Sequence, residues 1–203
     1  VVAFSAFVCF FPQLVAGPIE KAQHLLPQMQ TPRRVSYAQF ADGLRLVLWG
    51  FVKKMLLADR VAPFVQAVYG NPESDGTDLI MATVLFAFQI YGDFSGYSDI
   101  AVGTARLFGI RLSRNFHLPY FSSDIPSFWR RWHITLGAWL RDYVFYSVSL
   151  SKPFMSLSRS AKKHMNAHFA NVIPAAFALF FVWLGNGIWH GAAWKYIAYG
   201  LYY

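Results

Sequence analysis

Two long apolar runs most restrict what this chain can fold into. Residues 79–90 and residues 172–183 contain no charged side chain, and the first run continues in a helical pattern to about residue 107. Inside a bilayer every backbone N–H and C=O group must bond within the protein, so a spanning segment forms a helix or joins a closed barrel. The runs lack the period-two alternation of barrel strands. We therefore predict an all-α, polytopic transmembrane bundle with re-entrant or interfacial helices and no β-sheet core.

The composition supports a membrane protein and argues against other classes. Apolar residues make up 56% of the chain and charged residues 14%, with a mean hydropathy of +0.33, which is more apolar than an ordinary soluble domain. The formal charge of +8 comes from short clusters between apolar segments, so we expect membrane lipid and not nucleic acid as a partner. The single cysteine, Cys9, excludes an internal disulfide framework.

Helices are also expected outside the two apolar runs. Residues 37–59 are predicted to form a helix that is partly buried in protein or lies near the interface, because basic side chains interrupt their apolar pattern. Residues 128–150 are predicted to form a second, aromatic helix. Residues 1–15 are interpreted as the end of a membrane helix, and residues 16–34, which contain three prolines, as a polar loop.

Charge predicts the side of the membrane on which each loop lies. Residues 71–78 are acidic and contain no Lys or Arg, whereas residues 106–114 and 152–163 are basic. Since positive loops favour the cytoplasm, we expect residues 71–78 outside and both basic segments inside. Residues 115–150, with both flanks inside, should then dip into the membrane and return. Both chain ends lie in apolar stretches, so residues 1–203 are expected to be a single membrane-embedded fragment that lacks N-terminal helices and a C-terminal remainder.

One histidine lies at the end of the second apolar run. In the stretch WLGNGIWHGAAW, residues 183–194, His190 is surrounded by tryptophans and glycines. An ionisable side chain at membrane depth is costly and indicates a functional site by default. Glycines allow a substrate or another backbone to approach the ring closely. A hydrogen-bonded structural histidine fits these residues equally well.

A second polar group lies in the predicted helix at residues 128–150. Arg130, His133, Gly137 and Arg141 are spaced i, i+3, i+7 and i+11, which places them on one face of a helix. A guanidinium group presents a planar fork to phosphate or carboxylate, so this face suits an anionic ligand. Contacts with lipid headgroups or acidic partners are the alternative.

Two carboxylates fall within the first predicted membrane helix. Asp93 and Asp99 would each cost about 2.5–3.5 kcal/mol on insertion scales unless paired. We expect a structural polar cluster in which they pair with Lys or Arg. His164 and His168 have a spacing that can hold zinc, but no third ligand accompanies them in the sequence, and no metal site is predicted.

Several motifs together resemble the membrane-bound O-acyltransferase (MBOAT) family. They are WRRWHITLGAWLRDY at residues 129–143 and WHG at residues 189–191. Residues 11–19, 93–99 and 115–120 resemble further signatures of its bacterial branch, which includes the alginate O-acetylation and teichoic-acid D-alanyl transfer membrane proteins. The resemblance implies an all-helical fold of greater length, so residues 1–203 would be a catalytic-core fragment.

The resemblance also implies roles for individual residues. His190 matches the catalytic histidine and His133 the second characteristic histidine of the family. We expect the two rings to face one shared cavity, with His190 the essential one because its sequence surroundings are more apolar. Whether His190 acts as a base or carries the acyl group stays open. Donor or substrate binding is expected at Arg130, Arg141, Trp189 and Asn186.

The implied function is transfer of an acyl group, with acetyl favoured, to a hydroxyl of a cell-envelope polysaccharide or its carrier protein. The donor would be an acyl-CoA or acyl-carrier thioester, with no tightly bound cofactor. Expected partners are the polysaccharide or teichoic acid acceptor and an extracytoplasmic acyl-accepting protein, at a multi-pass bacterial cytoplasmic membrane location. Alternatives are D-alanyl transfer to teichoic acid, a scaffold for a secreted partner, and a transporter or channel component. In the last, histidines and aspartates would form an ion path.

Overall fold

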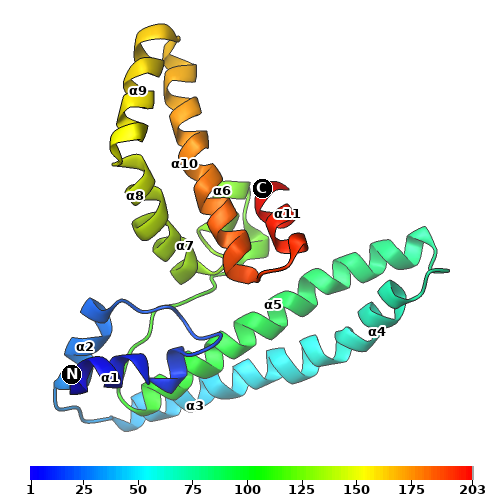
Figure 1. Cartoon of the computed structure of the whole chain (residues 1–203). Coiled ribbons are helices and arrows are strands. Elements are labelled where there is room, and N and C mark those ends of the chain that lie inside the picture. The colour runs from blue at the N-terminus through cyan, green and yellow to red at the C-terminus, as the bar shows by residue number, and fades with distance from the viewer. Residues whose placement is uncertain (203) are drawn as a thin grey trace. The chain divides into compact units, whose positions relative to one another are not determined.

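The computed structural model describes residues 1–202, which divide into two compact units, residues 1–135 and residues 136–202. Helices make up both units (Figure 1), and no strand occurs among the described residues. Helix α5 (Gly76–Leu107) in the first unit and helix α10 (Ala167–His190) in the second are long and apolar enough to cross a membrane. The predicted all-α fold class is thus confirmed, and both helices fall on the two apolar runs.

In the first unit a long helical rod lies beside α5 (Figure 1). The rod consists of α3 (Tyr37–Phe51), the π-helix η2 (Val52–Ala58) and α4 (Asp59–Gly70). The predicted helix at residues 37–59 is confirmed and continues to Gly70. The two backbones touch at glycines, since a Cβ added to Gly96 would lie 2.7 Å from the carbonyl oxygen of Gly50. Close backbone approach at small residues is typical of helix packing in membranes.

The π-helix supplies the partners of the two membrane carboxylates. Lys53 Nζ lies 2.6 Å from Asp99, and Lys54 Nζ lies 2.7 Å from Asp93 and 2.6 Å from Asp59. Both carboxylates thus form ion pairs with basic side chains of the rod. Such pairing removes the cost of an isolated charge at membrane depth.

The N-terminal segment differs from its prediction. Helix α1 (Val2–Val8) ends early and a 3-10 turn, η1 (Phe11–Gln13), follows it. The expectation of a polar loop throughout residues 16–34 is wrong, because α2 (Ala22–Gln30) forms within it despite Pro27. Leu25 of this helix is fully buried in the first unit's apolar core, and this burial favours the helix over the loop that the prolines suggested.

The continuous helix predicted at residues 128–150 is also wrong. The chain instead forms α6 (Ile125–Trp129), α7 (Ile134–Leu140), the π-helix η4 (Arg141–Phe145) and α8 (Tyr146–Ser149). The break ends at His133, whose φ is +45°. There the backbone forms hydrogen bonds with residues 115–117. The N–H of Ile134 donates to the backbone carbonyl of Asn115 (2.9 Å), and the N–H of His117 donates to the backbone carbonyl of Arg131 (2.9 Å). These long-range bonds replace those that a continuous helix would make.

The second unit contains a helical hairpin. Helix α9 (Lys152–His164) lies beside α10 (Figure 1), with Phe154 and Phe177 in ring contact. The basic segment expected as a loop is therefore a helix. Its basic side chains are exposed, whereas Ala161 is buried. Helix α11 (Trp194–Tyr202) contacts the C-terminal part of α10, and Gly187 meets Gly200 there.

Candidate active site

His133 is buried in a polar network in the first unit, with only 7% of its surface exposed. Its Nδ1 lies 3.0 Å from Oδ1 of Asn115. The same oxygen accepts hydrogen bonds from the backbone N–H of Thr135 (3.3 Å) and from the Thr135 hydroxyl (3.0 Å). Perpendicular to the imidazole lies the ring of Phe94, at a centroid distance of 4.6 Å. His133 is thus held by a hydrogen bond at Nδ1 and by a perpendicular ring contact with Phe94.

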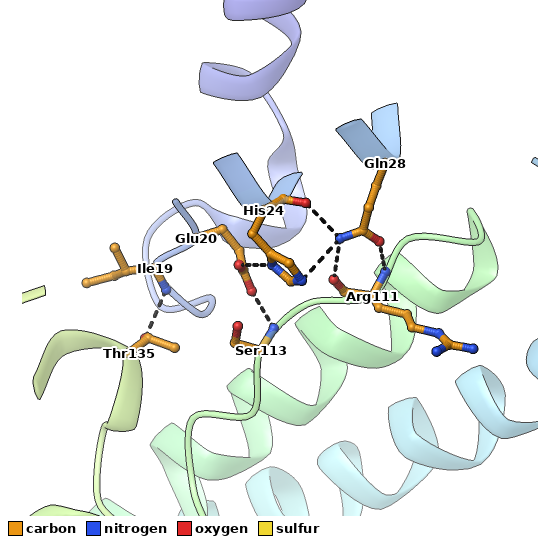
Figure 2. Close-up of polar contacts among 7 residues, drawn as sticks. All are labelled: Ile19, Glu20, His24, Gln28, Arg111, Ser113 and Thr135. Carbon is orange, nitrogen blue, oxygen red and sulfur yellow. Dashed lines mark hydrogen bonds and ion pairs between the residues drawn. The ribbon is translucent and has the colours of Figure 1, made fainter. Parts of the chain in front are cut away.

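The network continues into the loop that precedes α2 (Figure 2). The backbone N–H of Ile19 donates to the Thr135 hydroxyl at 3.0 Å. The Glu20 carboxylate accepts a hydrogen bond from the backbone N–H of Ser113 and lies 2.5 Å from Nδ1 of His24. The Glu20 side chain is only 2% exposed, so these partners compensate for the loss of hydration of its charge.

Gln28 completes the attachment of α2. Its side-chain amide donates to the carbonyl of Arg111 (3.0 Å) and accepts from the backbone N–H of Arg111 (2.9 Å), as Figure 2 shows. Sequence reasoning did not single out Glu20 or Asn115. A signal was present for Glu20, which is the single acidic residue before Asp42.

The surroundings of His190 lie at the junction of α10 and α11. The ring lies 4.8 Å from the Trp189 centroid, 6.2 Å from Tyr196 and 5.6 Å from Tyr199. Sequence reasoning expected Trp189 but missed both tyrosines. Within the second unit His190 is exposed, whereas His133 is buried in the first unit. The expectation that His190 is the essential histidine stays a prediction.

Asn186 lies one helical turn before His190, and both side chains contact Tyr199. It is 5% exposed, and its Nδ2 donates to the Tyr199 hydroxyl at 3.4 Å. Glycine makes this packing possible, because a Cβ at Gly187 would lie 2.4 Å from the Tyr196 carbonyl oxygen. The arrangement places an amide, a phenol and an imidazole together, a set of groups that can hydrogen-bond a polar substrate.

The predicted arginine face does not exist as a helical stripe. Arg130 and His133 precede α7, whereas Gly137 lies in α7 and Arg141 in η4. The reason is the break at His133, which ends the 3.6-residue period on which the stripe depended. Arg141 Nε lies 2.9 Å from Asp142, whose carboxylate raises the pKa of Arg141 above its ordinary value.

Arg130 belongs to the cap of α6. Its guanidinium donates to the Ser127 hydroxyl at 3.1 Å. Asp124, the N-cap, accepts the backbone N–H of Ser127 at 2.7 Å, and chiefly this bond lowers the pKa of the Asp124 carboxyl. Donor binding by Arg130 and Arg141 stays a prediction.

No cluster of three or more potential metal ligands occurs among residues 1–202. His164 ends α9 and His168 lies in α10, so their spacing does not place them on one helix. The two site histidines belong to different units, and a shared cavity stays a prediction.

Comparison with known proteins identifies the family. The model of MBOAT, the membrane-bound O-acyltransferase family, matches residues 1–161. This chain belongs to the MBOAT family. Membership establishes the chain as part of a membrane protein, in agreement with its two apolar helices.

Curated relatives extend the MBOAT match through the second unit. The "probable alginate O-acetylase AlgI" of Azotobacter vinelandii is 35% identical over 202 residues, covering 100% of this chain and 37% of that protein. The peptidoglycan O-acetyltransferase of Helicobacter pylori is 36% identical, covering 98% and 35%. The teichoic acid D-alanyltransferase of Bacillus subtilis is 29% identical, covering 97% and 48%. The MBOAT chain thus spans less than half the length of these relatives.

Proposed function

We propose that the intact protein is a membrane O-acetyltransferase of the bacterial cell envelope. It would act as a multi-pass protein of the cytoplasmic membrane on a hydroxyl of an envelope polysaccharide or its carrier protein. The observation that carries the proposal is 35–36% identity, over nearly the whole chain, to proteins named alginate O-acetylase and peptidoglycan O-acetyltransferase. Two teichoic acid D-alanyltransferases are 29% and 28% identical, which makes D-alanyl transfer the second candidate.

In the proposed reaction His190 is the general base. Its neutral imidazole removes the proton of the acceptor hydroxyl as the oxygen attacks the carbonyl carbon of an acyl thioester. The resulting tetrahedral intermediate collapses by breaking the C–S bond, and the imidazolium returns the proton to the leaving thiolate. A general base at such a step contributes about 10²–10⁴-fold.

The environment of His190 supports this role. Tyr199 and Asn186 place a hydroxyl and an amide beside the imidazole, and such groups can orient an acceptor hydroxyl. His133 is held rigidly by Asn115, as expected for a group that must meet a reacting molecule in one orientation. The donor is proposed to be acetyl-CoA or an acetylated carrier thioester.

The central test is acetyl transfer by the full-length protein in lipid nanodiscs, with radiolabelled acetyl-CoA and purified envelope polysaccharide. Ester formation is measured as hydroxylamine-labile label. His190→Ala is expected to slow transfer by about 10²–10⁴-fold. His168→Ala is the matched control, because His168 is exposed near the start of the same helix. Transfer at the wild-type rate by folded His190→Ala protein would remove His190 from the mechanism.

Donor choice separates the two candidate functions. The same preparation is offered an acetyl thioester and a D-alanyl thioester in parallel, with polysaccharide and teichoic acid as acceptors. Preference for the acetyl donor and polysaccharide supports the proposal. Preference for D-alanyl transfer would reassign the protein to the second candidate, and failure of both would favour a transporter or scaffold.

Proximity of the two histidines is tested by crosslinking. In a cysteine-free background of the full-length protein, which includes Cys9→Ser because Cys9 is exposed, cysteines replace His133 and His190. A short bifunctional maleimide should join them if both side chains face one cavity. Efficient single labelling at each position without any crosslink would contradict the shared cavity.

A further inference from the structure

We propose that Asn115 is a positioning residue that fixes His133 in the Nδ1–H tautomer and so makes Nε2 the basic nitrogen of that ring. The proposal rests on the proposed function only in placing His133 at the reacting site. Asn115 is 2% exposed, and its side chain lies between His133, Thr135 and Ser98.

The orientation of the Asn115 amide follows from its partners. The backbone N–H of Thr135 can only donate, so the Asn115 atom it meets at 3.3 Å must be the oxygen. The Thr135 hydroxyl accepts the backbone N–H of Ile19, and its own hydrogen then points to the same oxygen at 3.0 Å. Nδ2 of Asn115 correspondingly faces Ser98 Oγ at 3.3 Å. Reversing the amide would place NH₂ against an N–H donor.

The amide orientation decides the tautomer of His133. Nδ1 lies 3.0 Å from an oxygen that can only accept, so Nδ1 carries the hydrogen. In the neutral ring the lone pair therefore belongs to Nε2. A hydrogen bond from one ring nitrogen of a histidine in this way sets which nitrogen is available for chemistry.

Asn115 also holds the backbone on which His133 stands. Its carbonyl accepts the N–H of Ile134 at 2.9 Å, next to the left-handed φ of +45° at His133. A non-glycine residue keeps such a conformation only where surrounding contacts enforce it. One residue thus fixes both the backbone and the ring of the histidine.

An amide is suited to this task because it orients the ring without adding charge. The Asn115 amide holds Nδ1, and the rings of Phe94 and Phe116 contact the imidazole, without adding charge to it. A carboxylate in place of the amide would accept the same hydrogen bonds but would favour the imidazolium form.

The direct test is the ¹⁵N NMR spectrum of full-length protein labelled at histidine, in lipid and above the pH at which the ring is protonated. The His133 signals are assigned by their loss in His133→Ala. Wild-type protein is expected to show protonated Nδ1 and unprotonated Nε2, and Asn115→Leu is expected to lose this preference. Unprotonated Nδ1 in the wild type, or an unchanged tautomer in folded Asn115→Leu, would overturn the proposal. The wild-type result needs only the His133→Ala protein for its assignment and does not depend on the folding of Asn115→Leu.

The pH profile of acetyl transfer gives a second readout. The proposed function places a neutral His133 at the reacting site beside the base His190. Asn115→Asp is therefore expected to move the acid limb to higher pH by about one to three units, because the added carboxylate stabilises the inactive His133 imidazolium. Asn71→Asp adds the same charge in an exposed loop and should leave the limb in place. A lower rate in Asn115→Asp with an unmoved limb would indicate a merely structural role. If His133→Ala transfers acetyl normally, the role of His133 fails, while the NMR result still decides the tautomer.

Discussion

Replacing Gly187 with alanine should separate α11 from α10 and disturb the surroundings of His190. The added Cβ would lie 2.4 Å from the Tyr196 carbonyl oxygen and 3.1 Å from Cα of Gly200. Both are backbone atoms, so no side-chain rotation can relieve the overlap. Gly185 offers a matched control on the same helix, because a Cβ there has nothing within 4 Å.

The size of the effect follows from these distances. Ordinary contact begins near 3.4 Å, so α11 must move by about 1 Å, a misplacement that can cost on the order of 10²-fold in rate. Overpacking of this kind also costs about 1–3 kcal/mol of stability. At Gly185 the alanine should instead be neutral or stabilise the helix by about 0.5–1 kcal/mol. Tyr199 moves with α11, so its contacts with Asn186 and His190 should weaken.

The assay compares both variants as full-length protein in nanodiscs. The initial rate of acetyl transfer is measured per folded molecule, and thermal stability is followed by size-exclusion chromatography after heating. Gly187→Ala should be slower and less stable, and Gly185→Ala should match the wild type. If the two variants have equal rates and equal stability, then α11 does not position the groups around His190, and the reasoning fails.

Three further predictions concern other parts of the chain. Gly96→Ala should destabilise the first unit by about 1–3 kcal/mol, since its Cβ would meet the Gly50 carbonyl oxygen. Gly76→Ala is the control, because a Cβ there has nothing within 4 Å. Equal melting temperatures for the two variants would contradict the prediction. Arg141→Lys should raise the Michaelis constant for the acyl donor, because an ammonium lacks the bidentate fork; an unchanged constant would leave Arg141 with a structural role beside its acidic neighbour. In a cysteine-free background, a cysteine at exposed Ser160 should react from the cytoplasmic side of intact cells; labelling from outside would reverse the predicted orientation.

The apolar runs alone were sufficient to predict the two long helices. The physical reason is local: a backbone in lipid has to bond within its own segment, so hydropathy along the chain determines α5 and α10 directly. The pairing of Asp93 and Asp99 was predictable for a related reason, because an unpaired carboxylate at that depth is too costly. The identity of the partners was not predictable, since Lys53 and Lys54 lie in a π-helix on a separate segment that the sequence pattern did not place beside α5.

The surroundings of both histidines were decided by tertiary structure. The spacing of residues 128–150 favoured one continuous helix, yet the chain breaks at His133 because the backbone of Asn115 offers a better long-range partner. No periodicity encodes that bond, which joins residues distant in sequence. The same holds for Tyr199, which reaches His190 only because glycines let α11 pack against α10. Sequence thus determined which segments form the two long apolar helices and which motifs carry the histidines, whereas contacts between segments decided how each imidazole is held.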